Sequence, residues 1–151
     1  MKILTILLAA CMMVGCNGEQ SLMDDISANN VANVSAWLHS NKSPDEYLAD
    51  GWTPLTYASM MGKTEIVKML VSNGASINKP EGGGNTPLYW AAFNNSYDTV
   101  SYLVSAGANT CPVMEDRKSP RDIAQVKGYS SLLKIIPECK SQKIHSADQA
   151  R

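Results

Sequence analysis

Apolar and polar residues alternate at helical spacing through the middle of the chain. Between residues 64 and 71, four apolar side chains fall on one helix face: Ile66, Val67, Leu70 and Val71. A second helix is expected just before them, because Thr53 can cap a helix and Pro54 suits its first turn. Gly62 and Gly74 follow the two segments and favour their termination. The pattern therefore predicts a pair of short helices joined by a tight turn.

The same pattern returns every 33 residues. Three motifs mark the period: Thr53-Pro54-Leu55, Thr86-Pro87-Leu88 and, in weaker form, Ser119-Pro120-Arg121. Small residues keep the same offset: Ala58, Ala91 and Ala124, and the pairs Gly74-Ala75 and Gly107-Ala108. A 33-residue period with a Thr-Pro-Leu start resembles the ankyrin repeat, a hairpin loop followed by two antiparallel helices. The resemblance implies an all-α ankyrin-repeat solenoid of about four helix-turn-helix repeats with short hairpin loops.

The register also predicts how the chain is divided. The expected segments are a signal peptide at 1–15, a tether at 16–21, repeats at about 22–50, 51–83, 84–116 and 117–140, and a flexible tail at 141–151. The first and last repeats diverge, as expected where one face of a repeat meets water. Asp25 and Ile26 replace the small pair in the first repeat, and Arg121 replaces the Leu of the motif in the last.

The first sixteen residues are typical of an export signal. Lys2 precedes an apolar run that is too short for a mature membrane-spanning helix. Met13-Val14-Gly15-Cys16 resembles a bacterial lipobox, whose cysteine is lipidated and becomes the N-terminus. Leu8-Ala9-Ala10-Cys11 also fits, and an ordinary cleaved signal is a further alternative; cleavage at Cys16 is favoured because it leaves no apolar remnant. Asn17, rather than the Asp usual in inner-membrane lipoproteins, implies an anchor on the periplasmic face of the outer membrane.

Removal of the signal leaves two cysteines, Cys111 and Cys139. In an oxidising compartment such a pair is interpreted first as a disulfide. By the 33-residue register, Cys111 takes the position of Asn78, and Cys139 follows the second helix of the last repeat. Both should lie at the same edge of neighbouring repeats. We expect a disulfide, and two buried free thiols are the alternative.

Charge excludes one class of partner and leaves another open. The formal net charge of -1 argues against nucleic acid, because phosphate binding needs clustered Lys and Arg. The distribution is uneven, with 4 basic and 11 acidic side chains in residues 16–116 and 8 basic and 3 acidic in residues 117–151. Solubility of a mixed surface explains this asymmetry, and so does steering of an oppositely charged partner.

The sequence offers no catalytic constellation. Its two histidines, His39 and His145, lie far apart, and the adjacent carboxylates of Asp24-Asp25 and Asp45-Glu46 are interpreted as solvated charge. The run Glu81-Gly82-Gly83-Gly84 lacks the Lys-Ser or Lys-Thr pair of a phosphate loop, and it falls at an expected hairpin tip. Cys111 and Cys139 lack nearby metal ligands. We therefore expect a non-enzyme with no metal and no cofactor.

The resemblance to ankyrin repeats implies a protein-binding surface on the hairpin tips and the exposed side of the first helices. By register, the partner-binding positions are Asp50, Trp52, Met60, Met61, Glu81, Asn85, Phe93, Asn94, Glu115 and Asp116. Aromatic and Met side chains are favoured at interface centres, so Trp52 and Phe93 are the expected anchors. For Tyr57 and Trp90, packing is as good an interpretation as binding, and Trp37 is assigned to the core.

The resemblance extends to a class of partner. A small, lipid-anchored, periplasmic ankyrin protein is similar to immunity proteins that neutralise type VI secretion effectors such as phospholipases. This implies a monomer that binds a secreted toxin and contacts the membrane through its N-terminal lipid. A periplasmic scaffold or stress-related accessory protein supporting an envelope enzyme is the alternative. An effector exported to a host cell is disfavoured by the lipobox.

Overall fold

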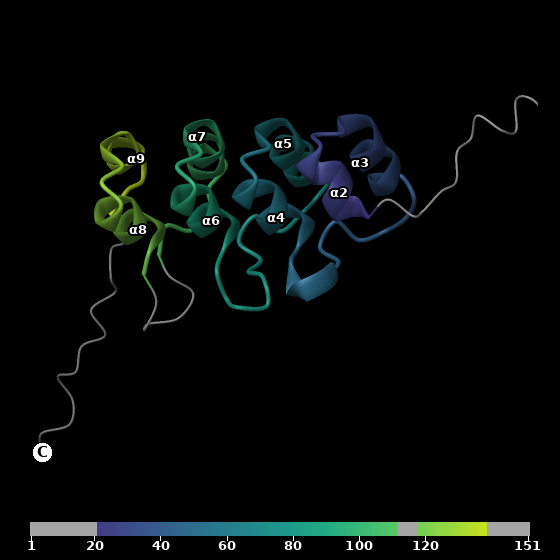
Figure 1. Cartoon of the computed structure of the whole chain (residues 1–151), viewed down its shortest axis with the longest axis horizontal. Helices are drawn as coiled ribbons and strands as arrows, with labels where there is room; N and C mark the ends of the chain where they lie inside the picture. The colour runs from purple at the N-terminus through teal and green to yellow at the C-terminus, as the bar shows by residue number, and fades with distance from the viewer. Residues whose placement is uncertain (1–20, 112–117, 139–151) are drawn as a thin grey trace, which may run out of the picture.

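A computed structural model of the chain describes residues 21–111 and 118–138. These residues form eight α-helices and one 3₁₀ turn, with no strand among them. The helices come in successive pairs: α2 (Leu22–Ser27) with α3 (Val31–Leu38), α4 (Pro54–Met60) with α5 (Thr64–Ser72), α6 (Pro87–Phe93) with α7 (Tyr97–Ser105), and α8 (Pro120–Val126) with α9 (Ser130–Ile135). The short turn η1 (Ala49–Gly51) lies between α3 and α4. The pairs stack side by side, which confirms the predicted helical solenoid (Figure 1).

Each first helix after α2 begins as the Thr-Pro-Leu pattern predicts. The Thr53 side chain caps α4 by accepting a hydrogen bond from the Thr56 amide at 3.1 Å. Thr86 caps α6 and Ser119 caps α8 in the same way, and a proline occupies the first turn of all three helices. Gly62 then ends α4 with a positive φ of 65°, where a Cβ atom would meet the Ser96 Oγ at 2.8 Å. Glycine is therefore favoured at this turn by its conformation, and Asn95 takes the same positive φ one repeat later.

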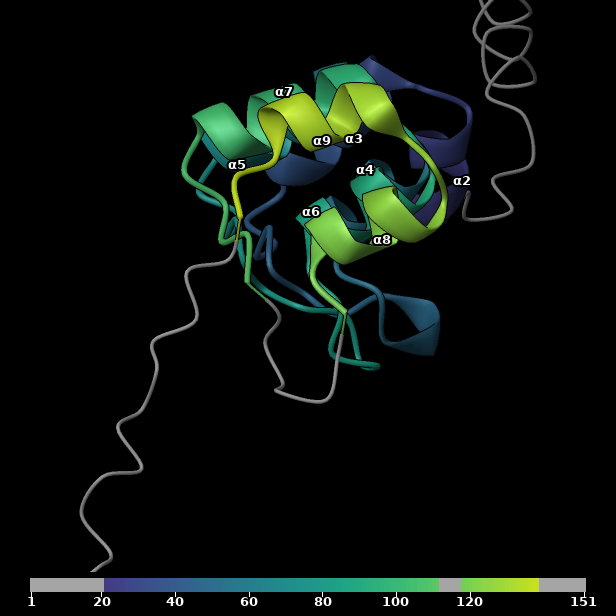
Figure 2. The same ribbon diagram turned by 90° about the vertical axis from the view of Figure 1, so that its left-hand side faces the viewer.

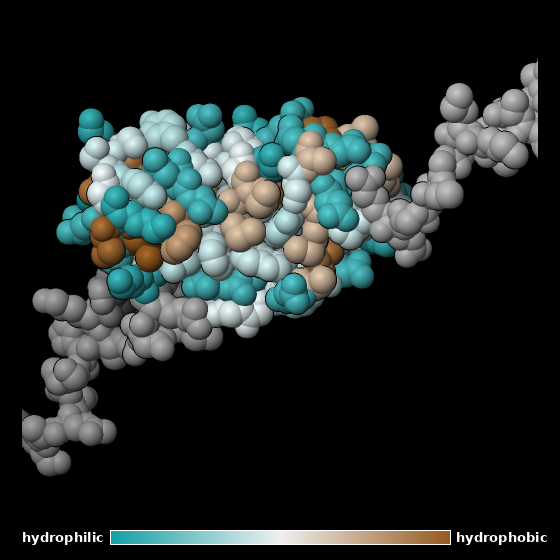
Figure 3. Space-filling model, in the orientation of Figure 1, coloured by the Kyte–Doolittle hydropathy of each residue, from teal (hydrophilic) through white to brown (hydrophobic). Residues whose placement is uncertain are grey.

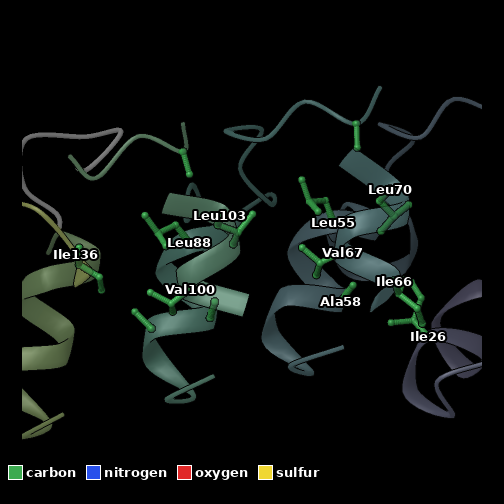
Figure 4. Packing of buried hydrophobic residues seen from close by; sticks show 14 of the residues in the cluster. Ile26, Leu55, Ala58, Ile66, Val67, Leu70, Leu88, Val100, Leu103 and Ile136 are labelled. Carbon is green, nitrogen blue, oxygen red and sulfur yellow. The ribbon is translucent and has the colours of Figure 1, made fainter. Parts of the chain in front are cut away.

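The core is aliphatic and lies between the two rows of helices. Ile66, Val67 and Leu70 of α5 and Val100 and Leu103 of α7 are fully buried, as their helical spacing predicts (Figure 4). The motif leucines of α4 and α6, Leu55 and Leu88, are 1% exposed. Three alanines, one in each of α4, α6 and α8, have no exposed surface: Ala58, Ala91 and Ala124. The small side chains let neighbouring first helices pack closely, so the 33-residue repeat in sequence becomes a continuous core.

Polar side chains join one repeat to the next at regular intervals. The Asp45 Oδ1 accepts a hydrogen bond from the Ser76 amide at 2.9 Å. One period later, the Asn78 Oδ1 accepts a bond from the Asn109 amide at 2.7 Å. Cys111 stands in the same register as Asp45 and Asn78, and Cys139 lies outside the described residues. In the two earlier repeats, the residue at the position of Cys111 forms a hydrogen bond to the following repeat.

Asp25 departs from the sequence interpretation of Asp24-Asp25 as a solvated pair. The Asp25 side chain is buried, with 7% of its surface exposed. It accepts hydrogen bonds from the Asn30 Nδ2 at 3.2 Å and the Asn33 Nδ2 at 2.8 Å. Adjacent carboxylates do point apart, as expected, but the fold turns this one inward, where two amides satisfy it. Asp24 stays exposed and completes the capping box of α2 with Ser21.

Candidate protein-binding surface

Two rows of helices give the molecule two unlike sides. Seen along the stack, α4, α6 and α8 form one row, α5, α7 and α9 form the other, and the hairpin loops extend from one end of both (Figure 2). Figure 3, in the orientation of Figure 1, shows the face of the molecule that has the first helices in its lower half and the second helices above them. Pale and tan residues cover the middle of this face over α4 and α6, and hydrophilic residues follow its hairpin side. The described residues among the predicted partner-binding positions belong to the first helices and their ends or to the hairpins.

Five aromatic side chains on this face contact one another across two neighbouring repeats, and we call them the aromatic strip: Trp52, Tyr57, Tyr89, Trp90 and Phe93. The ring centroids of Trp52 and Trp90, 38 positions apart in the chain, are 5.0 Å apart. Trp90 in turn lies 5.6 Å from Phe93. All five side chains are partly exposed. The strip therefore combines packing between repeats with a large aromatic surface open to solvent.

The rings of the strip meet mostly at steep angles. Trp52 and Trp90 are inclined by 55°, and Trp52 and Tyr57 by 67°. Edge-to-face contacts of this kind are favourable because the ring edge is positive and the ring face negative. The Tyr57 hydroxyl is also fixed, by a 2.8 Å hydrogen bond with the Ser27 Oγ of α2. These contacts hold the strip in one arrangement before any partner arrives.

Both predicted anchors belong to the strip, and so do the two residues that were ambiguous from sequence. Trp52 and Phe93 lie at different points of it, joined through Trp90. Tyr57 and Trp90 therefore pack against other rings of the strip and are also partly exposed to solvent. The Trp90 Nε1 is buried and makes no hydrogen bond among the described residues. What the sequence suggested as isolated anchors is one continuous cluster.

Flexible and polar side chains border the strip on α4 and α6. Met60 is partly exposed and Met61 is exposed, so both add apolar surface. The Asn94 Nδ2 donates a hydrogen bond to the Met60 carbonyl oxygen at 2.6 Å, which ties α6 to the end of α4. Asn94 thus has a role within the fold as well as an exposed position. On the side of α8, the Lys127 Nζ lies 3.5 Å from the centre of the Phe93 ring.

The second hairpin, the loop of residues 73–86 between α5 and α6, is held in shape by its own acidic residue. The Glu81 carboxylate accepts hydrogen bonds from the Asn85 amide at 3.0 Å, the Asn85 Nδ2 at 2.8 Å and the Gly83 amide. The Gly82 amide donates to the Gly51 carbonyl oxygen at 2.8 Å, so this hairpin also contacts the first. Glu81 and Asn85, predicted as partner-binding residues, therefore stabilise the loop that would carry the contact.

The first hairpin, the loop of residues 39–53 between α3 and α4, carries a feature that the sequence analysis missed. Tyr47 is 53% exposed, and the Lys79 Nζ lies 4.4 Å from the centre of its ring. The same ammonium group donates to the Asp45 carbonyl oxygen at 2.7 Å. Register could have placed Tyr47 on the hairpin that carries Asp50, because Tyr47 lies 33 positions before Pro80 of the next hairpin. Nothing in the sequence indicated that a lysine of that next repeat would cover its ring.

Two acidic residues of the first hairpin remain open to a partner. Glu46 and Asp50 are both exposed, and neither forms an ion pair with any residue in the described ranges. Asp50 has a φ of 57° inside η1, just two positions before Trp52. Of the other predicted site residues, Glu115, Asp116, Cys16 and Cys139 lie outside the described residues. Their roles stay predictions from the sequence.

Two kinds of feature are absent from the described residues. These residues hold no group of three or more His, Cys, Asp or Glu side chains placed to bind a metal ion. None of their helices combines the length and the apolar character required to cross a bilayer. The aromatic strip with its hairpins combines partly exposed aromatic rings with polar residues at its border, which is the composition typical of protein interfaces.

Comparison with known proteins gives matches over most of the repeat region. Residues 22–113 match the sequence profile of ankyrin repeats in three copies. The chain is 32% identical over 119 residues to XBAT35 of Arabidopsis thaliana, named as an E3 ubiquitin-protein ligase, covering 76% of this chain and 26% of that protein. It is 30% identical over 115 residues to human protein phosphatase 1 regulatory subunit 27, covering 76% of this chain and 74% of the relative. An ankyrin repeat protein of Borreliella burgdorferi shares 26% identity over 96 residues, or 64% of this chain and 42% of the relative.

Proposed function

Because this chain belongs to the ankyrin repeat family, whose repeats are protein-interaction modules, we propose that its aromatic strip is the surface on which a partner protein binds. The observation that carries the proposal is the contact of five partly exposed aromatic rings across two neighbouring repeats. Interfaces concentrate their energy in such aromatic residues near the centre of the contact. A strip that is already ordered also lowers the entropy cost of association. The chain itself acts by binding and carries out no catalysis.

The partner is a secreted toxin, and the protein is the immunity factor that neutralises it. A type VI secretion effector such as a phospholipase is the proposed target. Neutralisation requires a stable, pre-formed surface that covers the entrance of the toxin's active site, and the interlocked hairpins provide one. Immunity does not require the binding protein to have an active site. The alternative, an accessory protein for an envelope enzyme, draws support from the phosphatase regulatory subunits among the relatives.

The place of action is the periplasmic face of the bacterial outer membrane. This part of the proposal rests on the sequence Met13-Val14-Gly15-Cys16, with lipid on Cys16 as the anchor. Several acyl chains on one cysteine bind a bilayer durably, whereas a single chain does not. The unbound protein is a monomer on this surface. Mass spectrometry of the membrane-extracted N-terminal peptide tests the proposal, and an unmodified peptide would contradict it.

A disulfide between Cys111 and Cys139 closes the repeat array. The proposal is supported by register, because the equivalent positions Asp45 and Asn78 both bond to the following repeat through their side chains. At Cys111 a covalent bond replaces the hydrogen bond of the earlier positions. The oxidising periplasm would maintain it.

The proposed function can be tested at the level of the gene and of the protein. The neighbouring gene is expected to encode a secreted lipase or another toxin, and cells lacking this protein should be killed by siblings that deliver that toxin. Absence of both results contradicts the immunity role. An oxidative-stress enzyme or a transporter as neighbour would favour the accessory role.

For the protein, Trp52→Ala and Phe93→Ala should each weaken binding of the purified neighbouring gene product by about 1 to 4 kcal/mol. Tyr97→Ala is the matched control, because Tyr97 is a 46% exposed aromatic residue on α7, in the other row of helices. Calorimetric titration measures all three affinities. If Tyr97→Ala weakened binding as much as Trp52→Ala and Phe93→Ala, the strip would not be the binding surface.

A further inference from the structure

We infer that the end of the aromatic strip formed by Trp52 and Trp90 receives a cationic side chain, arginine or lysine, from a basic segment of the partner protein. The inference rests on the proposed function and adds the chemistry of the contact. It is built from three observations: the charge of the first two hairpins, the arrangement of the two indole rings, and a cation already bound at the opposite end of the strip.

Charge is distributed unevenly along the hairpins beside the strip. The first two hairpins carry four acidic residues, Asp45, Glu46, Asp50 and Glu81, and two basic residues, Lys42 and Lys79. Lys79 is already engaged, because its ammonium group contacts the Asp45 carbonyl oxygen and the Tyr47 ring. The two open carboxylates, Glu46 and Asp50, therefore give this end of the surface a negative potential. A basic segment is attracted to it and an acidic one is repelled.

The indole rings of Trp52 and Trp90 are arranged to accept a cation. With centroids 5.0 Å apart and planes inclined by 55°, they are tilted and not stacked face to face, and both side chains are partly exposed. The face of an indole carries the most negative quadrupole among protein side chains, so it binds guanidinium and ammonium groups. Asp50, two positions before Trp52, supplies the carboxylate that completes such a contact.

The other end of the strip already shows this chemistry within the chain. The Lys127 Nζ lies 3.5 Å from the centre of the Phe93 ring, and no carboxylate in the described residues pairs with Lys127. Among the described residues, the Phe93 ring is the group found next to this ammonium group. Trp52 and Trp90 are stronger cation acceptors than Phe93, and no lysine or arginine of the described residues covers them. The partner's side chain is expected to fill the place that Lys127 fills on Phe93.

The inference can be tested with a short peptide and a readout at each indole. The acetylated and amidated peptide Gly-Arg-Arg-Arg-Gly is titrated into the ¹⁵N-labelled protein, and the three indole N–H signals are followed by NMR. The signals of Trp52 and Trp90 should move with one saturation curve, and that of Trp37, which packs against the core on α3, should not. Equal movement of all three signals overturns the inference. So does an equal response to Gly-Glu-Glu-Glu-Gly.

Charge variants distinguish a specific cationic contact from non-specific binding of the peptide to the aromatic rings. The double variant Glu46→Gln with Asp50→Asn should bind the arginine peptide about three- to tenfold more weakly. Asparagine tolerates the positive φ of position 50, so the hairpin keeps its conformation. The double variant Glu65→Gln with Asp98→Asn also removes two negative charges, from α5 and α7 in the other row of helices, and should leave the peptide affinity unchanged. Unchanged affinity in the double variant overturns the inference.

Failure of this inference can be distinguished from failure of the proposed function. Suppose that the affinity of the natural partner fell on substitution of Trp52 and Phe93 but not on substitution of Glu46 and Asp50. Protein binding on the strip would then be supported, and the cationic anchor would be wrong. If the partner also ignored the changes at Trp52 and Phe93, the proposed binding surface itself would be wrong. Raising the sodium chloride concentration from 50 to 500 mM should weaken the wild-type complex and have less effect on the double variant.

Discussion

The middle repeats, α4 to α7, and the last repeat, α8 and α9, use the same motif position for different purposes. In the middle repeats this position holds Leu55 and Leu88, which are buried between neighbouring repeats. In the last repeat it holds Arg121, whose Nη1 donates hydrogen bonds to the Leu133 and Ile136 carbonyl oxygens at 2.6 and 2.5 Å. A repeat with neighbours on both sides is stabilised by apolar stacking. At the end of the array, the same position instead caps the carbonyl groups of the last helix.

The difference has a physical cause in the open end of α9. The last carbonyl groups of a helix have no partner within it, and a guanidinium group can satisfy two of them at once. Arg121 also lies 3.8 Å from the Glu138 carboxylate, although that carboxylate is largely exposed and adds little. Apolar burial and charged capping are thus alternative solutions for one position. The following predictions test how strictly the two regions divide these roles.

The largest effect on stability is expected from truncating a buried side chain in the middle repeats. Leu88→Ala removes a side chain that is 1% exposed and should lower the free energy of unfolding by about 2 to 5 kcal/mol, measured by urea denaturation. Leu133→Ala in the last repeat is the control, because Leu133 is only partly buried. Its loss should be clearly smaller. Equal losses at the two sites would contradict the division between stacked middle and capped end.

Next in size is the proposed covalent closure of the last repeat. On the chain-entropy account, a disulfide that closes about 28 residues contributes roughly 3 to 4 kcal/mol. Cys139→Ser should therefore lower the unfolding free energy of the oxidised protein by about that amount. The wild-type protein in reducing agent should match the variant, which serves as the check. Two thiols that react with a labelling reagent in the untreated protein would rule out the disulfide.

A smaller loss is expected when the motif is restored in the last repeat. Arg121→Leu recreates the Thr-Pro-Leu type of start and yet should destabilise the protein by about 1.5 to 3 kcal/mol, because two charge-assisted hydrogen bonds are lost. Arg121→Lys keeps the charge, but its ammonium group is not held in the guanidinium plane that aims Nη1 at both carbonyl oxygens, so its stability should fall between those of the wild type and Arg121→Leu. The midpoint of thermal unfolding gives the ranking. A gain in stability for Arg121→Leu would show that stacking dominates at the end of the array too.

The smallest effect concerns a hydroxyl pair between the middle repeats. The Thr64 and Thr99 hydroxyl groups are 2.8 Å apart, and Thr99 has no exposed surface. Thr99→Val keeps the shape and removes the bond, so a loss of about 1 kcal/mol is expected. Ser105→Ala is the control, since the Ser105 hydroxyl bonds only to the Tyr102 carbonyl oxygen of its own helix. If both variants had the same stability, the hydroxyl pair would contribute nothing to the joining of α5 and α7.

The helices, their caps and their buried faces could be predicted from the sequence because they depend on local patterns. Thr53, Pro54 and Gly62 act where the pattern placed them. The register also placed Trp52 and Phe93 on one face. It could not show that Trp90 joins them, because contact between rings depends on side-chain orientation across neighbouring repeats.

Two other residues form contacts that could not be predicted from the sequence. The substitution of Arg121 for the motif leucine was visible in the sequence, but its targets were not, since they are carbonyl groups of a helix twelve or more positions later. Asp25 was interpreted as solvated charge because adjacent carboxylates diverge and cannot face one substrate. Its burial depends on Asn30 and Asn33, which reach it only once α2 and α3 have packed together. Polar contacts formed by tertiary structure leave little trace in a periodic pattern.

The hydrogen bonds between neighbouring repeats all span similar stretches of chain. Those made by side chains, from Ser27 with Tyr57 to Thr64 with Thr99, join residues 30 to 35 positions apart. An additional copy of residues 51–83, inserted after residue 83, would present the Met60 carbonyl group, the Thr64 hydroxyl and the Asn78 side chain to the repeat that follows it. Its contacts with the repeat before it would differ, because Met61 and Ile66 occupy the positions that Asn94 and Thr99 hold one period later. Such a duplication would also add another Trp52 to the row. The length of the aromatic surface can thus change in evolution by steps of one repeat, provided that each new junction between repeats acquires its own polar pairs.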